Sequence, residues 1–310
     1  MIDVTLIGTA ALAPIPERAL SSALLTCEGH SILFDCGEGT QSAARRAGVS
    51  LMKTDIIALT HYHGDHIFGI PGLLQTMFSM GRTEPLYFAG PSGLPEVMSL
   101  MLRLTGELSY NVGLIEIPSG GLRLCELVQG WPVEALLEAF PTRHRCVSQG
   151  YSFTLGRAGK FNSSKAQELG VPLKFWRVLQ HGESVFLDGT EIKPEQVLGE
   201  RRKGLKVIFT GDTAMCKSLV NASKGADLMI CDATYGDEAH AEIALERGHM
   251  NFSQAAQSAQ LSGVKTLWLT HYSQSVTKPS AFLAKAQEIF PNTFCGHDGM
   301  TVTLKFSEES

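Results

Sequence analysis

Four potential metal ligands within six consecutive residues constrain the fold of this chain more than any other feature. They are His61, His63, Asp65 and His66. The apolar run 55–59 before them has the composition of a buried strand, and the run after them has helical periodicity. Imidazoles and a carboxylate this close together suit a borderline divalent cation, with zinc preferred and Mn²⁺ or Fe²⁺ as alternatives. The sequence therefore predicts a metal site on a strand-to-helix turn, which Gly64 allows to be sharp.

Short apolar runs and longer helical patterns alternate in the first and last thirds of the chain. Strands are expected at 2–7, 22–27, 31–35, 55–59, 206–210, 227–231 and 266–269, and helices at 66–79, 214–221, 252–262 and 279–289. Further strands are expected at 86–88, 113–117, 123–128, 133–139 and 150–155, with little helix between them, which favours antiparallel hairpins. Two comparable β/α halves predict a single α/β domain over residues 1–310, a helix–sheet–sheet–helix (αββα) sandwich of two mixed sheets.

Residues 156–205 are polar, basic and rich in glycine, with little signal of a core. The formal net charge of the whole chain is −5, which argues weakly against a nucleic-acid partner. From Arg143 to Lys206, however, twelve Lys and Arg residues stand against six Asp and Glu residues. Such a segment within a compact domain favours an inserted basic arm, although a solvated loop region with spare charge is the alternative.

The cysteine pattern and the N-terminal residues indicate the cellular compartment in which the protein is expected. The seven cysteines are scattered and form no Cys-x-x-Cys pair, which favours reduced thiols and gives no support to a zinc finger. The strand-like run 2–7 stands where a signal peptide would be, and no apolar run approaches the roughly 18 residues of a membrane helix. We therefore expect a cytoplasmic protein with no membrane contact.

The ligand cluster resembles the His-x-His-x-Asp-His signature of the metallo-β-lactamase superfamily. Three later positions follow in the order of that superfamily, namely His144, Asp212 in Gly-Asp-Thr, and His271 in Leu-Thr-His. The resemblance implies the fold of that superfamily and two metal ions that share Asp212. The implied ligands are His61, His63, His144 and Asp212 for the first ion, and Asp65, His66, Asp212 and His271 for the second. Taken singly, the later positions could also be an exposed histidine, a helix-capping aspartate and a core histidine.

Within this superfamily the chain resembles the ribonuclease Z family, through the runs 31–41, 66–74 and 194–199. The resemblance implies a zinc-dependent endoribonuclease that removes 3′ trailers from precursor tRNA and leaves a 3′ hydroxyl. It also implies a homodimer in which the arm of one subunit, residues 156–205, binds tRNA for the site of the other. Asp65 would orient the attacking water, and His249, held by Asp232, would donate a proton to the leaving oxygen.

Some positions depart from the pattern of that family. Asp232 stands where the family has a glutamate, which is one methylene longer. The loop 14–19 keeps Arg18 but lacks the lysine and asparagine of the family, and the arm lacks a clear Gly-Pro pair. The candidate RNA contacts are Arg18, Lys174, Trp176 and Arg177, which would hold phosphates or stack on bases. The departures in the loop and in the arm thus bear on substrate recognition rather than on hydrolysis.

Two other functions are compatible with the sequence. A hydrolase of the same superfamily could act on small phosphodiesters, cyclic nucleotides or other esters, but a basic arm has no use there. A non-catalytic RNA-binding protein could retain only the fold, but complete ligand sets argue against it. Deletion of the arm and measurement of the metal content would separate these functions from a tRNA-processing nuclease.

Overall fold

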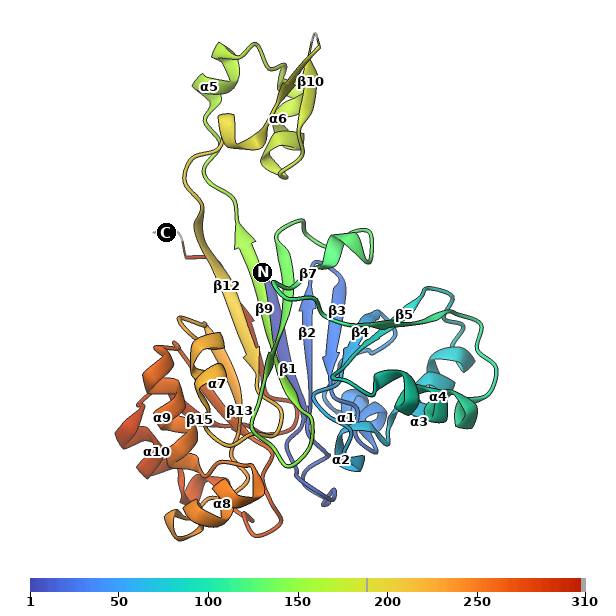
Figure 1. The fold of residues 1–310 in the computed structure, drawn as a ribbon, viewed down its shortest axis with the longest axis vertical. Coiled ribbons are helices and arrows are strands. Elements are labelled where there is room, and N and C mark those ends of the chain that lie inside the picture. Colours follow the sequence, from blue (N-terminus) through green and yellow to red (C-terminus); the bar gives the residue numbers. More distant parts are fainter. Residues whose placement is uncertain (188, 308–310) are drawn as a thin grey trace.

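The computed structural model describes residues 1–187 and 189–307. In these residues no helix is both long and apolar enough to cross a membrane. The described strands form two large sheets and a small hairpin, and helices cover the outer faces of the large sheets (Figure 1).

The first sheet is built mainly from the N-terminal part of the chain. Its strands, in spatial order, are β16 (Thr301–Leu304), β1 (Ile2–Gly8), β2 (Ser22–Cys27), β3 (His30–Phe34), β4 (Thr54–Ala58), β5 (Leu86–Ala89) and β6 (Val112–Ile115). Pairs from β16 to β3 are antiparallel, and pairs from β3 to β6 are parallel. The outer face is covered by α1 (Thr40–Arg46), α3 (Ile70–Ser79) and α4 (Leu94–Thr105). The short helix α2 (Gly64–Ile67) follows β4 at the edge where the parallel strands end.

The second sheet has the order β15 (Thr293–Cys295), β14 (Leu267–Thr270), β13 (Leu228–Asp232), β12 (Arg202–Phe209), β9 (Gln149–Arg157), β8 (Ala135–Pro141) and β7 (Leu122–Arg123). Strands β12 to β15 are parallel, and β12, β9, β8 and β7 pair antiparallel. Its outer face is covered by α7 (Lys217–Ala222), α9 (Phe252–Ser262) and α10 (Leu283–Ile289). The remaining helical turns are η1 (Leu124–Glu126), η3 (Glu238–His240), α8 (Ala241–Arg247) and η4 (Pro279–Ala281). Both sheets are therefore mixed, as predicted.

The two sheets pack face to face through one apolar layer. Phe34 on β3 stacks on Phe209 on β12 with ring centroids 5.1 Å apart. A second apolar cluster, which includes Met77 of α3, fills the space between the first sheet and its helices. A third, which includes Phe252 of α9, does the same for the second sheet. This order of layers confirms the predicted αββα sandwich.

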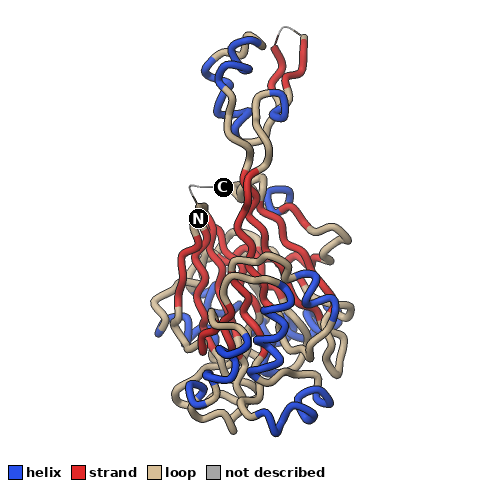
Figure 2. The backbone as a smooth tube through the Cα atoms, turned by 90° about the vertical axis from the view of Figure 1, so that its left-hand side faces the viewer, coloured by secondary structure: helices blue, strands red, loops and turns tan. Residues whose placement is uncertain are grey.

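Between β9 and β12 the chain leaves the body and forms a small unit of its own (Figures 1 and 2). Its elements are α5 (Ser163–Glu168), α6 (Leu173–Gln180), the hairpin β10 (Val185–Leu187) and β11 (Thr190–Ile192), and η2 (Pro194–Gln196). Its core consists of Ala166, Val171, Leu179, Val185, Ile192 and Val197. Because β9 and β12 still pair at Arg157 and Arg202, we define the arm as residues 158–201. It has a core that its polar sequence does not indicate.

The predicted hairpins between 86 and 155 are wrong for β5 and β6, which are parallel and joined by α4. This helix buries Leu94, Met98 and Met101 at helical spacing. Leu100 and Leu104 on the same helix are exposed. These apolar residues on the solvent side obscure the periodicity that predicts a helix.

Two shorter predictions also need correction. The predicted strand 123–128 pairs with β8 only up to Arg123 and then turns into η1, because Leu124 is buried at the start of a helical turn. The predicted helix 66–79 is interrupted between α2 and α3 at Gly69. A Cβ at Gly69 would lie 2.0 Å from the carbonyl oxygen of Gly37. The break thus lets the chain pass close to the loop after β3.

Candidate metal centre

The deeper part of the predicted site is centred on Asp212, which follows β12. Its Oδ1 lies 3.3 Å from His66 Nε2 and 3.1 Å from His271 Nε2. Asp65 Oδ2 lies 3.6 Å from each of these nitrogens. Within the described residues, Asp212 Oδ1 and the two imidazole nitrogens are buried without a hydrogen-bond partner. Buried polar atoms that face one another in this way fit a shared cation, since an unpaired buried polar group is otherwise costly. We call these four residues the second donor set.

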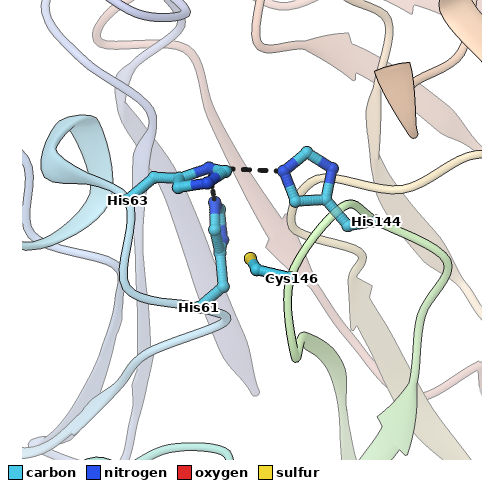
Figure 3. Close-up of side chains that lie close together, drawn as sticks. All are labelled: His61, His63, His144 and Cys146. Atoms are coloured by element: carbon cyan, nitrogen blue, oxygen red, sulfur yellow. Dashed lines mark hydrogen bonds between the residues drawn. The ribbon is translucent and has the colours of Figure 1, made fainter. Parts of the chain in front are cut away.

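Three more imidazoles, those of His61, His63 and His144, lie close together (Figure 3), and two of them face the other oxygen of Asp212. His63 Nδ1 lies 2.9 Å from His61 Nε2 and 3.3 Å from His144 Nε2. Asp212 Oδ2 lies 3.6 Å from His61 Nε2 and 4.0 Å from His144 Nε2. We call these four residues the first donor set. The structure thus brings together all seven predicted ligands, from four separate segments of the chain.

Hydrogen bonds on the far side of the rings fix the orientation of four imidazoles. The Nδ1 atoms of His61, His66, His144 and His271 lie 3.0, 2.7, 2.9 and 2.9 Å from Thr60 Oγ1, Asp35 Oδ2, the Gly248 carbonyl oxygen and Thr234 Oγ1, respectively. Each ring therefore turns its Nε2 toward Asp212. Partners of this kind typically orient the histidine ligands of metal sites and raise their basicity.

Asp35 is a functional residue that the sequence analysis did not identify. It follows β3, is fully buried, and accepts hydrogen bonds from the backbone N–H and hydroxyl of Thr60 as well as from His66. Its backbone is left-handed, with a φ of 55°, and so is that of His271, with a φ of 61°. This conformation costs a non-glycine residue about 1–2 kcal/mol. Backbone strain at the ends of two strands beside the site is typical of residues whose position is fixed for function. The signal for Asp35 in the sequence is a charged residue directly after a buried strand.

The neighbours of each ionisable side chain in the centre determine whether that side chain is charged. Burial, and then the nearby His66, lower the pKa of His61 to about 2, so its ring is neutral. Burial disfavours the cation of His66, but Asp212 and Asp35 outweigh this and raise its pKa well above the usual range. Burial likewise disfavours the carboxylate of Asp212, but His271 and His66 outweigh this and hold its pKa well below the usual range. A cation that binds would therefore displace the proton of His66.

His249 lies beside the centre without belonging to either donor set. Its Nδ1 is 2.8 Å from Asp232 Oδ2, so the shorter aspartate still reaches it. Asp232 is buried, and Thr234, which the sequence analysis also missed, donates to its other oxygen from N–H and hydroxyl. Burial disfavours the imidazolium of His249, but the charge and hydrogen bond of Asp232 outweigh it and raise its pKa to about 9. The pair therefore keeps a proton at neutral pH next to the donor sets.

A cleft of about 580 Å³ opens beside this pair. Its lining includes His249, His271, Tyr235 and two arginines, Arg145 and Arg247. Arg247 donates to the hydroxyl of Tyr235 over 3.2 Å. Guanidinium groups at the mouth of such a cleft suit a phosphate group. Neither arginine is among the predicted contacts.

The predicted RNA contacts do not lie together. Arg18 is buried in the N-terminal loop, where Nη1 donates to the Val276 carbonyl over 2.7 Å and the guanidinium covers the ring of Tyr272. This packing makes Arg18 a structural residue and corrects its predicted contact with RNA. Trp176 packs on Phe161 in the arm, and its indole N–H donates to a backbone carbonyl.

Trp176 is half-buried because its ring packs against the arm core, so the ring is not free to stack on an RNA base. Lys174 and Arg177 are exposed on α6. Of the four predicted RNA contacts, these two therefore keep their side chains accessible to a partner.

Several known families and proteins are similar to this chain. A family model described as beta-lactamase superfamily domain matches residues 124–272, and one described as anti-Pycsar protein Apyc1 matches residues 2–97. The chain is 41% identical to the Ribonuclease Z of Lachnospira eligens, with 100% of both chains covered. It is 39% identical to the Ribonuclease Z of Clostridioides difficile, with 99% of this chain and 100% of the relative covered. Among solved structures, the short form of human tRNase Z has 26% identity and a TM-score of 0.67, with 98% of this chain and 100% of that chain covered.

Proposed function

The chain belongs to the ribonuclease Z family of the metallo-β-lactamase superfamily, and on this premise we propose that it is a metal-dependent endoribonuclease that removes 3′ trailers from precursor tRNA. The observation that carries the proposal is the position of Asp212, whose two oxygens face two separate donor sets. Nuclease chemistry with two metals needs such a shared centre, because both the attacking and the leaving oxygen must be stabilised.

We assign one cation to each donor set. The first set is His61, His63, His144 and Asp212, and the second is Asp65, His66, Asp212 and His271. Nitrogen and carboxylate donors in these numbers suit zinc. Two bound cations would supply a water of lowered pKa and would neutralise charge at the phosphorus. The carboxylate of Asp65, which accepts a hydrogen bond from the backbone N–H of Leu12 over 2.8 Å, orients the attacking water.

The remaining steps belong to residues that line the cleft. Arg145 and Arg247 bind the phosphate oxygens of the RNA backbone. His249 donates its proton to the departing 3′ oxygen, and Asp232 stabilises the imidazolium until then. The cut then leaves a 3′ hydroxyl on the tRNA and a 5′ phosphate on the trailer. We place this activity in the cytoplasm, as expected from the sequence.

The arm is proposed to bind the tRNA away from the cut. The excess of basic residues between Arg143 and Lys206 supports this, as does the exposure of Lys174 and Arg177. The arm lies at one end of the β9–β12 pair, whereas His144 and Asp212 lie at the other end (Figure 1). Eight residues of β12 span roughly 27 Å. An arm that points away from its own site fits a homodimer in which it serves the site of the partner.

Exposed apolar side chains support the homodimer. Phe68, Leu100 and Leu104, around α3 and α4, are 65%, 62% and 77% exposed. Large apolar side chains exposed in this way are compatible with a protein interface on these elements. The arrangement can be tested by mixing two inactive variants, Asp212→Ala and a deletion of the arm. The mixed dimer pairs an intact site with the arm of the other subunit, so partial recovery of cleavage supports it. No recovery in a dimer shown to be mixed by mass would contradict it.

The proposed function is tested with a tRNA precursor that carries a 3′ extension. We expect one cut next to the discriminator base, a 3′ hydroxyl on the product, and about two equivalents of metal by elemental analysis. Asp212→Ala should abolish the cut, whereas Asp237→Ala, at an exposed aspartate outside the centre, should not. A cut elsewhere, or cleavage only of small phosphodiesters, would remove the tRNA assignment.

A further inference from the structure

One potential ligand beside the first donor set is not used by the proposed reaction. Cys146 follows His144 by two residues on the loop between β8 and β9, and its thiol is exposed. Its Sγ and one ring nitrogen each of His61, His63 and His144 all lie within 4.8 Å of one another (Figure 3). The thiol is therefore one member of a cluster of four metal-binding groups rather than an isolated surface cysteine.

The position of Cys146 is fixed by the loop that carries it. The hydroxyls of Thr142 and Ser148 lie 2.7 Å apart and close the loop at its base. The backbone N–H of Gln149 donates to the Thr60 carbonyl over 2.9 Å, directly beside His61. The loop is thus tied to the strand end that holds the first imidazole, and the thiol remains near the cluster as a consequence of the fold.

The first donor set leaves room for a further donor. Donor atoms on a tetrahedral zinc ion lie about 3.3–3.8 Å apart, since Zn–N and Zn–S distances are about 2.0 and 2.3 Å. Asp212 Oδ2 lies 3.6 Å from His61 Nε2, which is within this range, and 4.0 Å from His144 Nε2, which is beyond it. The Sγ of Cys146 lies within 4.8 Å of the three imidazole nitrogens, so a shift of at most about 1 Å meets the same condition. Rotation of an exposed side chain can supply such a shift.

We propose that Cys146 ligates the first metal through its thiolate as a fifth donor, in addition to His61, His63, His144 and Asp212. The inference rests on the metal centre of the proposed function. The thiol releases its proton to water as the sulfur–metal bond forms, so the step needs no oxidant or reductant. Sulfur is a soft donor, so this ligand makes the first site prefer zinc over manganese.

Cobalt substitution tests the sulfur–metal bond without reference to activity. The wild-type protein loaded with Co²⁺ should show a thiolate-to-cobalt charge-transfer band in the near ultraviolet, and Cys146→Ser should lack it. The variant should keep the visible absorption of cobalt held by histidine and carboxylate. The matched control is Cys125→Ser, at a half-buried cysteine outside the cluster, which should retain the band.

Two further measurements follow from the same bond. Zinc should protect Cys146 from alkylation by iodoacetamide in the wild-type protein. Cys146→Ser should lower the zinc affinity about 10-fold or more and change the manganese affinity by less than about 2-fold. Identical cobalt spectra for wild type and Cys146→Ser would overturn the inference and leave the metal centre intact. Failure of the wild-type protein to bind cobalt at all would instead contradict the metal centre itself.

Discussion

The body of the molecule buries charge, whereas the described residues of the arm bury only apolar side chains. In the body Asp35, Asp212 and Asp232 are 0%, 3% and 1% exposed, and each is held by hydrogen bonds or facing imidazoles. In the arm the core is apolar, and Lys174 and Arg177 lie on the surface. Buried charges need fixed partners, whereas exposed charges make adaptable contacts that depend on salt. The comparison supports the proposal in which the body cleaves the bond and the arm captures the substrate.

The largest expected effect is that of removing the arm. Replacement of residues 158–201 by a short Gly-Ser turn should lower kcat/KM for precursor tRNA about 1000-fold, since several phosphate contacts are lost together. Hydrolysis of bis-p-nitrophenyl phosphate should stay within about 2-fold of the wild type, because the donor sets lie in the body. Steady-state kinetics on both substrates checks this. Equal loss on both would show that the arm supports the site rather than the substrate.

His249→Ala should also act mainly on RNA, but through the chemical step. We expect kcat for precursor tRNA to fall about 100-fold with KM unchanged, because a general acid is lost. The p-nitrophenyl ester should be affected much less, since its leaving group needs no proton. His297→Ala, at an exposed histidine, is the control. A rise in KM without a change in kcat would place His249 in binding instead.

The pH dependence of the cleavage rate should depend on Asp232 in the body and not on the arm. With the pKa of His249 raised to about 9 by Asp232, the proton donor is present at neutral pH and is lost as the pH rises through about 9. Asp232→Asn removes the charge and should move this limb down toward the usual histidine value of about 6.5, which lowers the rate at pH 8 about 30-fold. The rate at pH 6 should change far less. An unmoved alkaline limb in the single-turnover profile would contradict this prediction.

Asp35→Asn tests the buried charge of the body at a distance from the substrate. The amide lacks the negative charge of the carboxylate and has one acceptor oxygen instead of two, so it cannot accept from both His66 Nδ1 and the Thr60 N–H. We expect the affinity for zinc to fall about 10-fold. Excess zinc should then restore cleavage of both substrates, since the change acts on the metal and not on RNA. Competition with a zinc chelator measures the effect, and an unchanged affinity would exclude Asp35 as a positioning residue.

The smallest effect is expected on the surface of the arm. Lys174→Ala with Arg177→Ala should weaken binding of precursor tRNA about 3-fold and reduce the slope of log affinity against log salt by about 1–2. Lys224→Ala with Lys285→Ala, at exposed lysines of the body, is the matched control. If the control pair has the larger effect, the tRNA lies on the body and the comparison fails.

The sequence was sufficient to predict which residues gather around Asp212, because all of them lie in the segments that follow β4, β8, β12 and β14. It was not sufficient for the residues behind them. Asp35 and Thr234 act through hydrogen bonds to ring nitrogens, and no spacing along the chain indicates such contacts. The assignment of Arg18 failed for a related reason, since burial under the N-terminal loop depends on contacts with Val276 and Tyr272, distant in sequence.

The arm shows a different limit of sequence patterns. Its six core residues are spread over short helices and a hairpin, so no window contains enough of them to signal a core. In α4, the opposite problem arises, because exposed Leu100 and Leu104 add apolar residues where the pattern needs polar ones. Periodicity over short windows therefore predicted the long buried strands of the body better than it predicted the arm or α4.

The separate core of the arm affects how the molecule opens locally. None of its six core residues belongs to the apolar clusters of the body, and besides β9 and β12 the two parts share an ion pair from Arg201 to Glu134 at 3.8 Å. A unit of about 40 residues gains little stability from so small a core. The arm should therefore exchange its amide hydrogens through partial unfolding while the sandwich stays closed. Bound RNA would first slow that exchange in residues 158–201. An RNA that contacts only the arm would therefore stabilise the arm without changing the stability of the sandwich that holds the metal centre.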